Sequence, residues 1–285
     1  MIVSDGASPR AELRPDASPA SAHVTLRGVT KVFPGAKDRA PVHALGPVDL
    51  ALNSGEFFAV VGPSGCGKST LLELIAGLTQ TTDGVVEFEG RAIRGEVPEG
   101  VGVVFQEDAC LPWLNVVDNI AFSLRHAPLS SSDKTDRVQR ALQLMGLVDF
   151  ATSYPAQLSG GMRQRVCIAR TLVMQPRLIL LDEPFGALDQ QTRLLMGEEL
   201  LRLWRQTGAT VFLITHALDE AAMLADRIGV MSARPGRLID MVETQWPRER
   251  DSRIVEDPRF GAITARLWKS LREESMKTLG KAAPA

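Results

Sequence analysis

A glycine-rich stretch, GPSGCGKST at residues 62–70, has the residue types that bind phosphate, and it matches the pattern G-x-x-x-x-G-K-[S/T] in full. Glycines let a backbone fold closely around phosphates with its N–H groups pointing inward, Lys68 supplies charge for the β- and γ-phosphates, and the Ser69 hydroxyl can coordinate Mg²⁺. A tight turn with an exposed lysine is the alternative. The apolar strand-like run FFAVV precedes the stretch and the helical pattern KSTLLELIAGL follows it, which favours phosphate binding. We therefore predict a nucleotide-binding loop made of Gly62, Pro63, Ser64, Gly65, Cys66, Gly67, Lys68, Ser69 and Thr70.

Two acidic residues end a second apolar run, RLILLDEP at 177–184. A carboxylate at the tip of such a strand can hold a metal ion on a nucleotide bound at the neighbouring loop, which assigns Asp182 to Mg²⁺. Side chains alternate along an extended backbone, so Glu183 is expected to point elsewhere and to orient or deprotonate an attacking water. The alternative is a solvated acidic pair at the end of a strand.

Two further polar residues follow apolar runs. His216 comes directly after TVFLIT and would reach the same edge of the sheet, where we predict a contact with the γ-phosphate; a purely structural histidine is the alternative. Gln106 follows VGVVF and could contact the metal ion or the water, although a glutamine alone does not distinguish these roles.

A second anion-binding pattern is LSGGMRQR at residues 158–165, where Ser159, Gly160 and Gly161 open a helical pattern. Backbone N–H groups at the start of a helix bind anions such as phosphate. One nucleotide needs only one phosphate loop, so this second device must serve a nucleotide held by something else.

The composition is that of an ordinary globular protein: 285 residues, 45% hydrophobic and 23% charged, with a net charge of −2. The lack of a basic excess argues against broad nucleic-acid binding. Cys66, Cys110 and Cys167 form no C-x-x-C pair, so we expect reduced, mostly buried thiols in a cytosolic protein. Residues 1–21 show no secretory signal and are expected to be a flexible tail. No stretch approaches the ~18 consecutive apolar residues of a transmembrane helix, so a role at a membrane would require a partner.

Short apolar runs separated by helical patterns predict an α/β fold with a mostly parallel core sheet. An N-terminal antiparallel β portion precedes this sheet, and a helical subdomain at about residues 107–175 is inserted into it. In residues 246–285, Phe260, Ile263, Leu267 and Leu271 recur at helical spacing. This C-terminal helix either packs on its own domain or binds a partner. The expected strands are HVTLRGV, HALGPVDLAL, 57–61, 84–90, 101–105, 177–182, 210–215 and 227–231.

Taken in order, these motifs resemble those of the ATP-binding subunit of an ABC transporter, over about residues 22–245. The LSGG pattern is the most specific element, because general P-loop ATPases lack it. The resemblance implies a P-loop ABC-type ATPase domain that binds ATP and Mg²⁺ as a dimer, with Ser159, Gly160 and Gly161 against the γ-phosphate of the opposite protomer. It implies the Walker A loop at 62–70, the Q-loop at Gln106, the signature at 158–164, Walker B at 178–182, the catalytic carboxylate Glu183, the D-loop at 187–189 and the switch histidine His216. Phe33 would stack on adenine, with Phe57 and Phe58 as rival aromatics.

The stretch ACLPWLNVVDNIAFSL, with LLDEPFGALD and ITHALDEAAMLADRI, resembles the nitrate/sulfonate/taurine importer group. Residues 111–114, which we call the LPWL segment, form an apolar group that suits docking of a membrane subunit's short coupling helix. Alternatively, Trp113 packs inside the helical subdomain. Ala217 departs from the group, which often has Asp there, and this puts the coupling of the switch region in doubt. Met162 stands where Gln is commoner, but the backbone donors of the signature do not depend on it.

The resemblance thus implies an ATPase at the cytoplasmic face of the membrane that powers integral permease subunits importing a small anionic compound. A second copy of the chain and, indirectly, a substrate-binding protein would be its partners, without nucleic acid. One alternative is the ATPase of an exporter or lipid-trafficking system, and another is an ABC-type ATPase acting on DNA or ribosomes. A plain P-loop kinase would leave LSGGMRQR unexplained.

Overall fold

The computed structural model describes residues 22–35, 40–106, 109–186 and 188–282, and beyond residue 276 it gives only the course of the last helix. The predicted tail at 1–21 and Ala187 of the predicted D-loop lie outside the described residues.

A six-stranded sheet forms the centre of the molecule, in the order β10-β9-β3-β8-β7-β6. The pairs within β9-β3-β8-β7-β6 are parallel, and β10 runs antiparallel to β9 at the edge. All residues of β3, β7 and β8 are buried, as expected of strands covered on both faces. The strands are β3 (Phe57–Val61), β6 (Val101–Val104), β7 (Leu178–Asp182), β8 (Thr210–Ile214), β9 (Arg227–Met231) and β10 (Leu238–Glu243).

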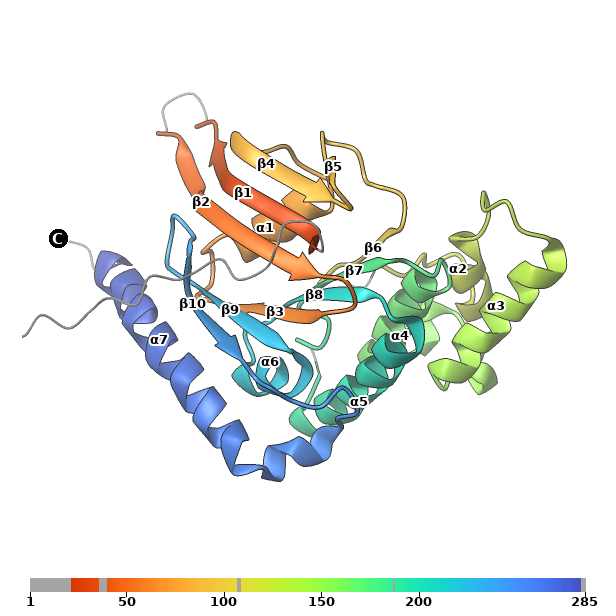
Figure 1. Ribbon diagram of the computed structural model, residues 1–285. Coiled ribbons are helices and arrows are strands. Elements are labelled where there is room, and N and C mark those ends of the chain that lie inside the picture. Colours follow the sequence, from red (N-terminus) through yellow and green to blue (C-terminus); the bar gives the residue numbers. More distant parts are fainter. Residues whose placement is uncertain (1–21, 36–39, 107–108, 187, 283–285) are drawn as a thin grey trace, which may run out of the picture.

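A second, antiparallel sheet of four strands covers one face of the first, in the order β2-β1-β4-β5 (Figure 1). Side chains of β3 alternate between two cores: Phe58 and Val60 pack with the second sheet and α1, whereas Phe57, Ala59 and Val61 pack with the helices of the other face. The elements are β1 (Ala22–Phe33), β2 (Val42–Asn53), β4 (Asp83–Phe88), β5 (Arg91–Ala92) and α1 (Lys68–Ile75).

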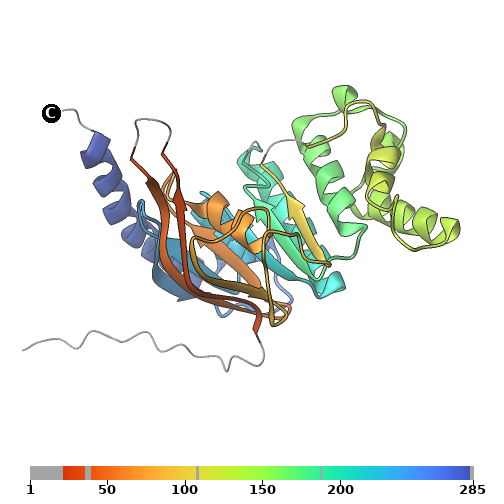
Figure 2. The same cartoon turned by 90° about the horizontal axis from the view of Figure 1, so that it is seen from above.

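Three helices are inserted between β6 and β7 and project to one side of the sheets (Figures 1 and 2). They are α2 (Val116–Phe122), α3 (Ser131–Leu144) and α4 (Gly160–Leu172); the short 3-10 turns η1 (Val148–Phe150) and η2 (Pro155–Gln157) lie between α3 and α4. Two more helices, α5 (Gln190–Thr207) and α6 (Leu218–Leu224), connect β7 to β8 and β8 to β9. The predicted α/β fold, with its parallel core, antiparallel N-terminal portion and inserted helices, is confirmed.

The C-terminal segment ends in the turn η3 (Ser252–Glu256) and the long helix α7 (Pro258–Ala282), which runs along the edge of the molecule (Figure 1). Ile263, Leu267 and Leu271 are buried in the larger core, so this face of α7 packs on its own domain. The opposite face is exposed and includes Trp268.

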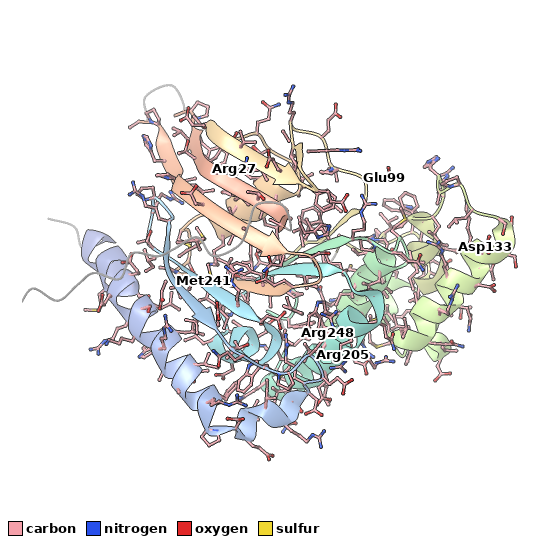
Figure 3. All side chains as sticks on the ribbon, viewed as in Figure 1. Arg27, Glu99, Asp133, Arg205, Met241 and Arg248 are labelled. Carbon is pink, nitrogen blue, oxygen red and sulfur yellow. The ribbon has the colours of Figure 1, made fainter. Side chains whose placement is uncertain are left out.

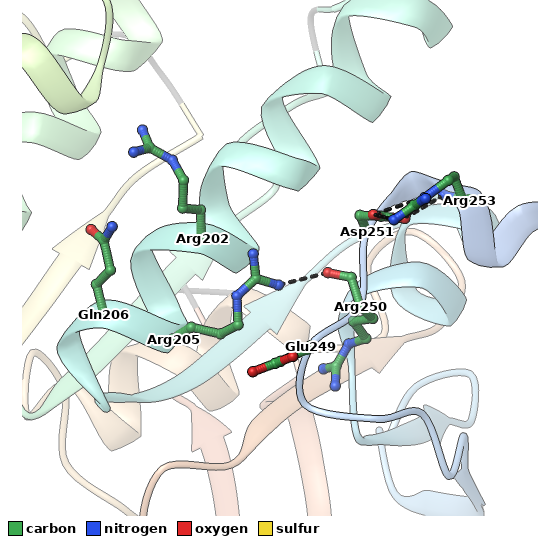
Figure 4. Close-up of a pocket in the computed structure, with 7 residues that line it drawn as sticks. All are labelled: Arg202, Arg205, Gln206, Glu249, Arg250, Asp251 and Arg253. Carbon is green, nitrogen blue, oxygen red and sulfur yellow. Dashed lines mark hydrogen bonds and ion pairs between the residues drawn. The ribbon is translucent and has the colours of Figure 1, made fainter.

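Arginines fasten the start of this segment to the body. Arg250 is buried and forms an ion pair with Asp226 (2.7 Å), and its carbonyl accepts a hydrogen bond from Arg205 of α5 (2.6 Å). Arg248, which is labelled in Figure 3, lies over the ring of Trp204, 4.3 Å from its centroid. The open cavity of about 540 Å³ at this junction is lined by Arg202, Arg205, Gln206, Glu249, Arg250, Asp251 and Arg253 (Figure 4).

Candidate functional site

The glycine-rich loop joins the end of β3 to the start of α1. Its conformation depends on glycine: Gly65 and Gly67 have φ angles of +72° and +106°, where other L-residues are strained. A Cβ atom at Gly67 would stand 2.9 Å from the carbonyl oxygen of Ala44 and 2.8 Å from Leu45 Cδ2. Ser64, Gly65 and Ser69 are exposed, so this side of the loop is open to a ligand.

Lys68 begins α1 and is buried inside the loop. Its ammonium donates hydrogen bonds to the carbonyl oxygens of Gly62 (2.9 Å) and Pro63 (3.2 Å). Cys66 is buried beside it, and burial raises the pKa of this thiol, although the charge of Lys68 partly opposes the shift. The loop therefore holds a positive charge at its centre, which is the electrostatic requirement for binding a polyphosphate.

Asp182 ends β7 beside the Ser69 hydroxyl. Burial raises the pKa of Asp182, while the neighbouring Ser69 hydroxyl and the charge of Lys68 lower it. Its Oδ1 atom is buried without a hydrogen-bond partner. A buried carboxylate oxygen with a free acceptor position next to a serine hydroxyl fits the oxygen ligands that Mg²⁺ takes beside nucleotide phosphates.

Glu183 gathers the other two polar residues predicted for this edge. Its Oε2 atom lies 3.1 Å from Nε2 of Gln106 and 3.2 Å from Nδ1 of His216. Gln106 follows β6 and His216 follows β8, each with one residue in between, so residues from three strand ends meet here. The Glu183 side chain is largely buried, whereas Gln106 and His216 are exposed, which leaves the cluster open to solvent on one side.

Glu183 and Asp182 face different partners, but not because side chains alternate along a strand, as the sequence led us to expect. Strand alternation does not set the direction of Glu183, because β7 ends at Asp182 and Glu183 has a positive φ of 47°. Its N–H donates to the carbonyl oxygen of Ile214 (2.9 Å), which fixes this turn against β8. A left-handed conformation at a non-glycine residue is uncommon and is typical of functional sites.

Among the aromatic residues considered for adenine stacking, Phe57 and Phe58 are fully buried in the two cores and cannot contact a ligand. Phe33 ends β1 and is 36% exposed, with the Lys31 ammonium 4.9 Å from the centroid of its ring. Phe33 therefore stays a prediction as the adenine contact.

The signature residues lie at the start of α4. Ser159 is the N-cap of this helix, and its hydroxyl accepts from the N–H of Met162 (3.3 Å), while Gly160 and Gly161 form the first turn. The N–H groups at this end point out of the helix and can bind an anion. In the chain, α4 belongs to the inserted helices, whereas the glycine-rich loop precedes α1 on the body of the molecule (Figures 1 and 2).

Pro112 and Trp113 of the LPWL segment are exposed, and its two leucines are half-buried. Trp113 is 69% exposed, contrary to the alternative that it packs inside the helical subdomain. Asn119, a fully buried residue of α2, hydrogen-bonds to the backbone of the LPWL segment and was not among the residues predicted from the sequence. Its side chain accepts from the N–H of Leu111 and donates to the carbonyl oxygens of Leu111, Leu114 and Asn115. A polar residue within an apolar helical pattern was the available signal.

Two charged residues near the site were also missed. Arg234, from the turn between β9 and β10, donates two hydrogen bonds to the carbonyl oxygen of Gly65 (2.9 and 3.1 Å) and so supports the loop from outside. Glu220 of α6 is buried behind Glu183, where its Oε2 accepts from the Thr215 hydroxyl (2.6 Å). Arg234 belongs to none of the quoted motifs, whereas Glu220 lies within the stretch ITHALDEAAMLADRI, but only its burial and its contact with Thr215 single it out there.

A glycine-rich loop between a buried strand and a helix, with an acidic strand end beside its serine, defines a P-loop nucleotide-binding protein. Comparison with known proteins then gives the family. The family model described as ABC transporter matches residues 45–186. A taurine import ATP-binding protein of Pseudomonas aeruginosa is 47% identical over 221 residues, covering 76% of this chain and 84% of that protein.

A nitrate import ATP-binding protein of Synechococcus elongatus is 45% identical over 240 residues, covering 82% of this chain and 86% of that protein. A dimeric ATP-binding cassette solved in a post-hydrolysis state with ADP and Pi is 30% identical, with a TM-score of 0.69, and covers 79% of this chain and all of that one. The chain therefore belongs to the ABC transporter family and is an ATP-hydrolysing subunit of it. Within the described residues, no helix is long and apolar enough to cross a membrane.

Proposed function

We propose that two copies of this chain bind two ATP molecules between them and power a membrane importer of a small anion. The observation that carries the proposal is the separation of two anion-binding devices, the loop at residues 62–70 and the α4 start at Ser159, in different parts of one chain. In a dimer that places the start of α4 of one copy opposite the glycine-rich loop of the other, both anion-binding parts contact the same ATP molecule. The likeness to a dimeric cassette supports this arrangement.

Within each site, Ser69 and Asp182 would hold Mg²⁺, which neutralises charge on the β- and γ-phosphates. Lys68 would exchange its two carbonyl contacts for phosphate oxygens. Glu183 would accept a proton from the attacking water, and His216 and Gln106, both within hydrogen-bond reach of its Oε2, would orient that carboxylate. Gln106 as a further Mg²⁺ ligand and Phe33 as the adenine contact belong to the same proposal.

For coupling, the exposed LPWL segment is the docking surface for a membrane subunit. A large exposed tryptophan on a segment that Asn119 holds in one conformation is typical of a protein contact. The LPWL segment follows Gln106 closely in the chain. A movement of this segment on binding a membrane subunit would therefore displace Gln106, which contacts Glu183. In this proposal the protein works at the cytoplasmic face of the membrane, with permease subunits as direct partners and a substrate-binding protein as an indirect one.

The anion class rests on the relatives, whose names give taurine and nitrate as imported compounds. Substrate contacts belong to other subunits, so the specific compound would be found by isolating the binding protein of this system and measuring its affinity for taurine, alkanesulfonates and nitrate. An exporter ATPase would have the same nucleotide site; co-purification with an importer permease distinguishes the two.

The alternative of an ABC-type ATPase that acts on DNA or ribosomes is tested by adding nucleic acid. We expect ATP turnover to be unaffected.

Glu183→Gln tests the function most directly. The amide cannot accept a proton from water, so we expect ATP binding to be retained, turnover to fall at least about a hundredfold, and an ATP-bound dimer to accumulate. Size-exclusion chromatography with ATP and a phosphate-release assay measure these changes. Glu199→Gln, the same change in an exposed pair with Arg202 on α5, is the matched control and should leave turnover intact. Unchanged hydrolysis in Glu183→Gln would remove Glu183 from its role.

A further inference from the structure

Two thiols that are far apart in the sequence lie in contact beside the candidate site. The Sγ atoms of Cys110 and Cys167 are 3.6 Å apart, and Cys110 Sγ also lies 3.4 Å from the carbonyl oxygen of Arg163. Cys167 is buried on α4, whereas Cys110 is half-buried in the segment between β6 and α2. Neither is in a disulfide. The absence of a C-x-x-C pair in the sequence did not predict this contact, because 57 residues separate the two cysteines along the chain.

The pair can close into a disulfide with a small movement. A disulfide bond is about 2.05 Å long, so the sulfur atoms must approach by roughly 1.5 Å. Cys167 is fixed within a regular helix, but residues 109 and 110 belong to no helix or strand and precede the part held by Asn119, so they can take up the shift. Cys110 is partly accessible to a small oxidant, and the buried Cys167 is in place as the resolving thiol.

The position of the pair gives such a bond a functional consequence. Cys110 follows Gln106 by four residues, and Gln106 contacts Glu183. Cys167 lies about two turns along the helix that begins at the signature residues Ser159 and Gly160. A bond between the two cysteines ties the segment that carries Gln106 and the LPWL segment to the signature helix, which restricts rearrangement of these parts during the ATP cycle.

We propose that Cys110 and Cys167 are an oxidisable dithiol, and that a peroxide converts them to an intramolecular disulfide that slows ATP turnover. The inference rests on the proposed role of Gln106 in hydrolysis. The Cys110 thiolate attacks the peroxide oxygen, forming a sulfenic acid and releasing water or an alcohol. The Cys167 sulfur then displaces hydroxide from the sulfenic sulfur; with the proton of that thiol, the hydroxide leaves as water. In total the two thiols lose two protons and two electrons, and the peroxide takes them up as it is reduced.

Cys66 is the internal reference for this chemistry. It is buried within the phosphate loop, and burial raises the pKa of its thiol, so it offers little thiolate to an oxidant. Loss of activity through Cys66 would persist when either of the other cysteines is replaced.

The test treats the purified full-length protein with hydrogen peroxide and follows two readouts. Peptide mass mapping without reductant should find the peptides of Cys110 and Cys167 joined, with the loss of two hydrogen atoms. ATP turnover should fall in the same samples and recover with dithiothreitol. Cys110→Ser and Cys167→Ala keep side chains of similar size. Before oxidation each variant should turn over ATP as fast as the wild type in its dithiol form, and each should keep that rate after peroxide treatment.

The outcomes separate this proposal from the proposed function. Absence of the joined peptides, with normal turnover in the reduced protein, overturns the dithiol and leaves the ATPase role standing. Joined peptides without loss of turnover overturn the regulatory effect, and equal inactivation of Cys110→Ser assigns the loss to another residue. Lack of turnover in the reduced wild type would count against the proposed function instead.

Discussion

At the scale of single residues, Glu220 stands out as a buried carboxyl group behind the candidate site. Its Oε2 accepts from Thr215, but its Oε1 is buried without a hydrogen-bond partner. Burial raises the pKa of Glu220 from its ordinary 4.5 to about 7; the bond from Thr215 and the charge of Arg193 lower it, and the charge of Glu183 raises it further. The protein therefore holds a proton here that the unfolded chain releases.

This shift predicts a pH dependence of stability. Between pH 4.5 and about 7 the folded state binds more protons than the unfolded state, so the free energy of unfolding falls as pH rises through this window. The loss amounts to about 3 kcal/mol if Glu220 alone is considered. Glu220→Gln, which stays neutral, should match the wild type near pH 4.5 and exceed it in stability at pH 8.

Urea denaturation across this pH range measures the effect. Asp219→Asn, which removes the neighbouring exposed carboxyl group on the same helix, is the control and should follow the wild-type curve. Parallel curves for the wild type and Glu220→Gln would show that Glu220 does not titrate differently in the two states.

At the scale of elements, α6 begins without a side-chain cap. Ala217 is its N-cap residue and has an extended backbone (φ −87°, ψ 111°) that suits a capping serine. We expect Ala217→Ser to raise the free energy of unfolding by about 1 kcal/mol, because its hydroxyl can accept from the N–H groups of Asp219 or Glu220. Chemical denaturation under reducing conditions measures this. Ala217→Cys has a similar shape but a poor acceptor, and equal stabilisation by it would contradict the capping explanation.

The LPWL segment gives the second prediction at this scale. Trp113→Ala should leave the ATP turnover of the isolated protein unchanged, because a side chain that is 69% exposed contributes little packing, but it should weaken co-purification with the permease subunits. Trp268→Ala on α7 removes an almost equally exposed tryptophan (61%) and is the control. Equal loss of permease binding in both variants would show that exposure of a tryptophan, rather than the LPWL segment, is responsible.

The core strands were predicted from short apolar runs, and in β3 and β7 such a run is ended by glycine or by an acidic residue. Two strands were missed. β5 has two exposed residues, and β10 is a half-exposed edge strand whose pattern LIDMVE lacks such a run. Motif order predicted the residues around Glu183, but the left-handed turn at Glu183 and the contact of Cys110 with Cys167 depend on packing between distant segments.

At the scale of the whole molecule, each nucleotide site is proposed to form between two copies. The phosphate loop of one chain should then bind ATP without the N-terminal end of α4 of the same chain. Ser159→Arg replaces the cap hydroxyl with a large cation at this end. We expect it to abolish hydrolysis by separating the two copies at the γ-phosphate, while ATP binding to the monomer through Lys68 and its loop stays nearly normal.

Ser130→Arg is the matched control, since Ser130 caps α3 in the same way, with its hydroxyl accepting from the N–H of Asp133 (3.1 Å). Both variants lose a helix cap, at a cost of about 1 kcal/mol in the free energy of unfolding. Because the substitution is the same, any difference in hydrolysis or ATP binding between them is due to the position of the serine. ATP binding measured at concentrations where the protein is monomeric, alongside phosphate release, decides the assignment. If Ser159→Arg severely weakened binding to the monomer while Ser130→Arg did not, the signature would act within its own chain.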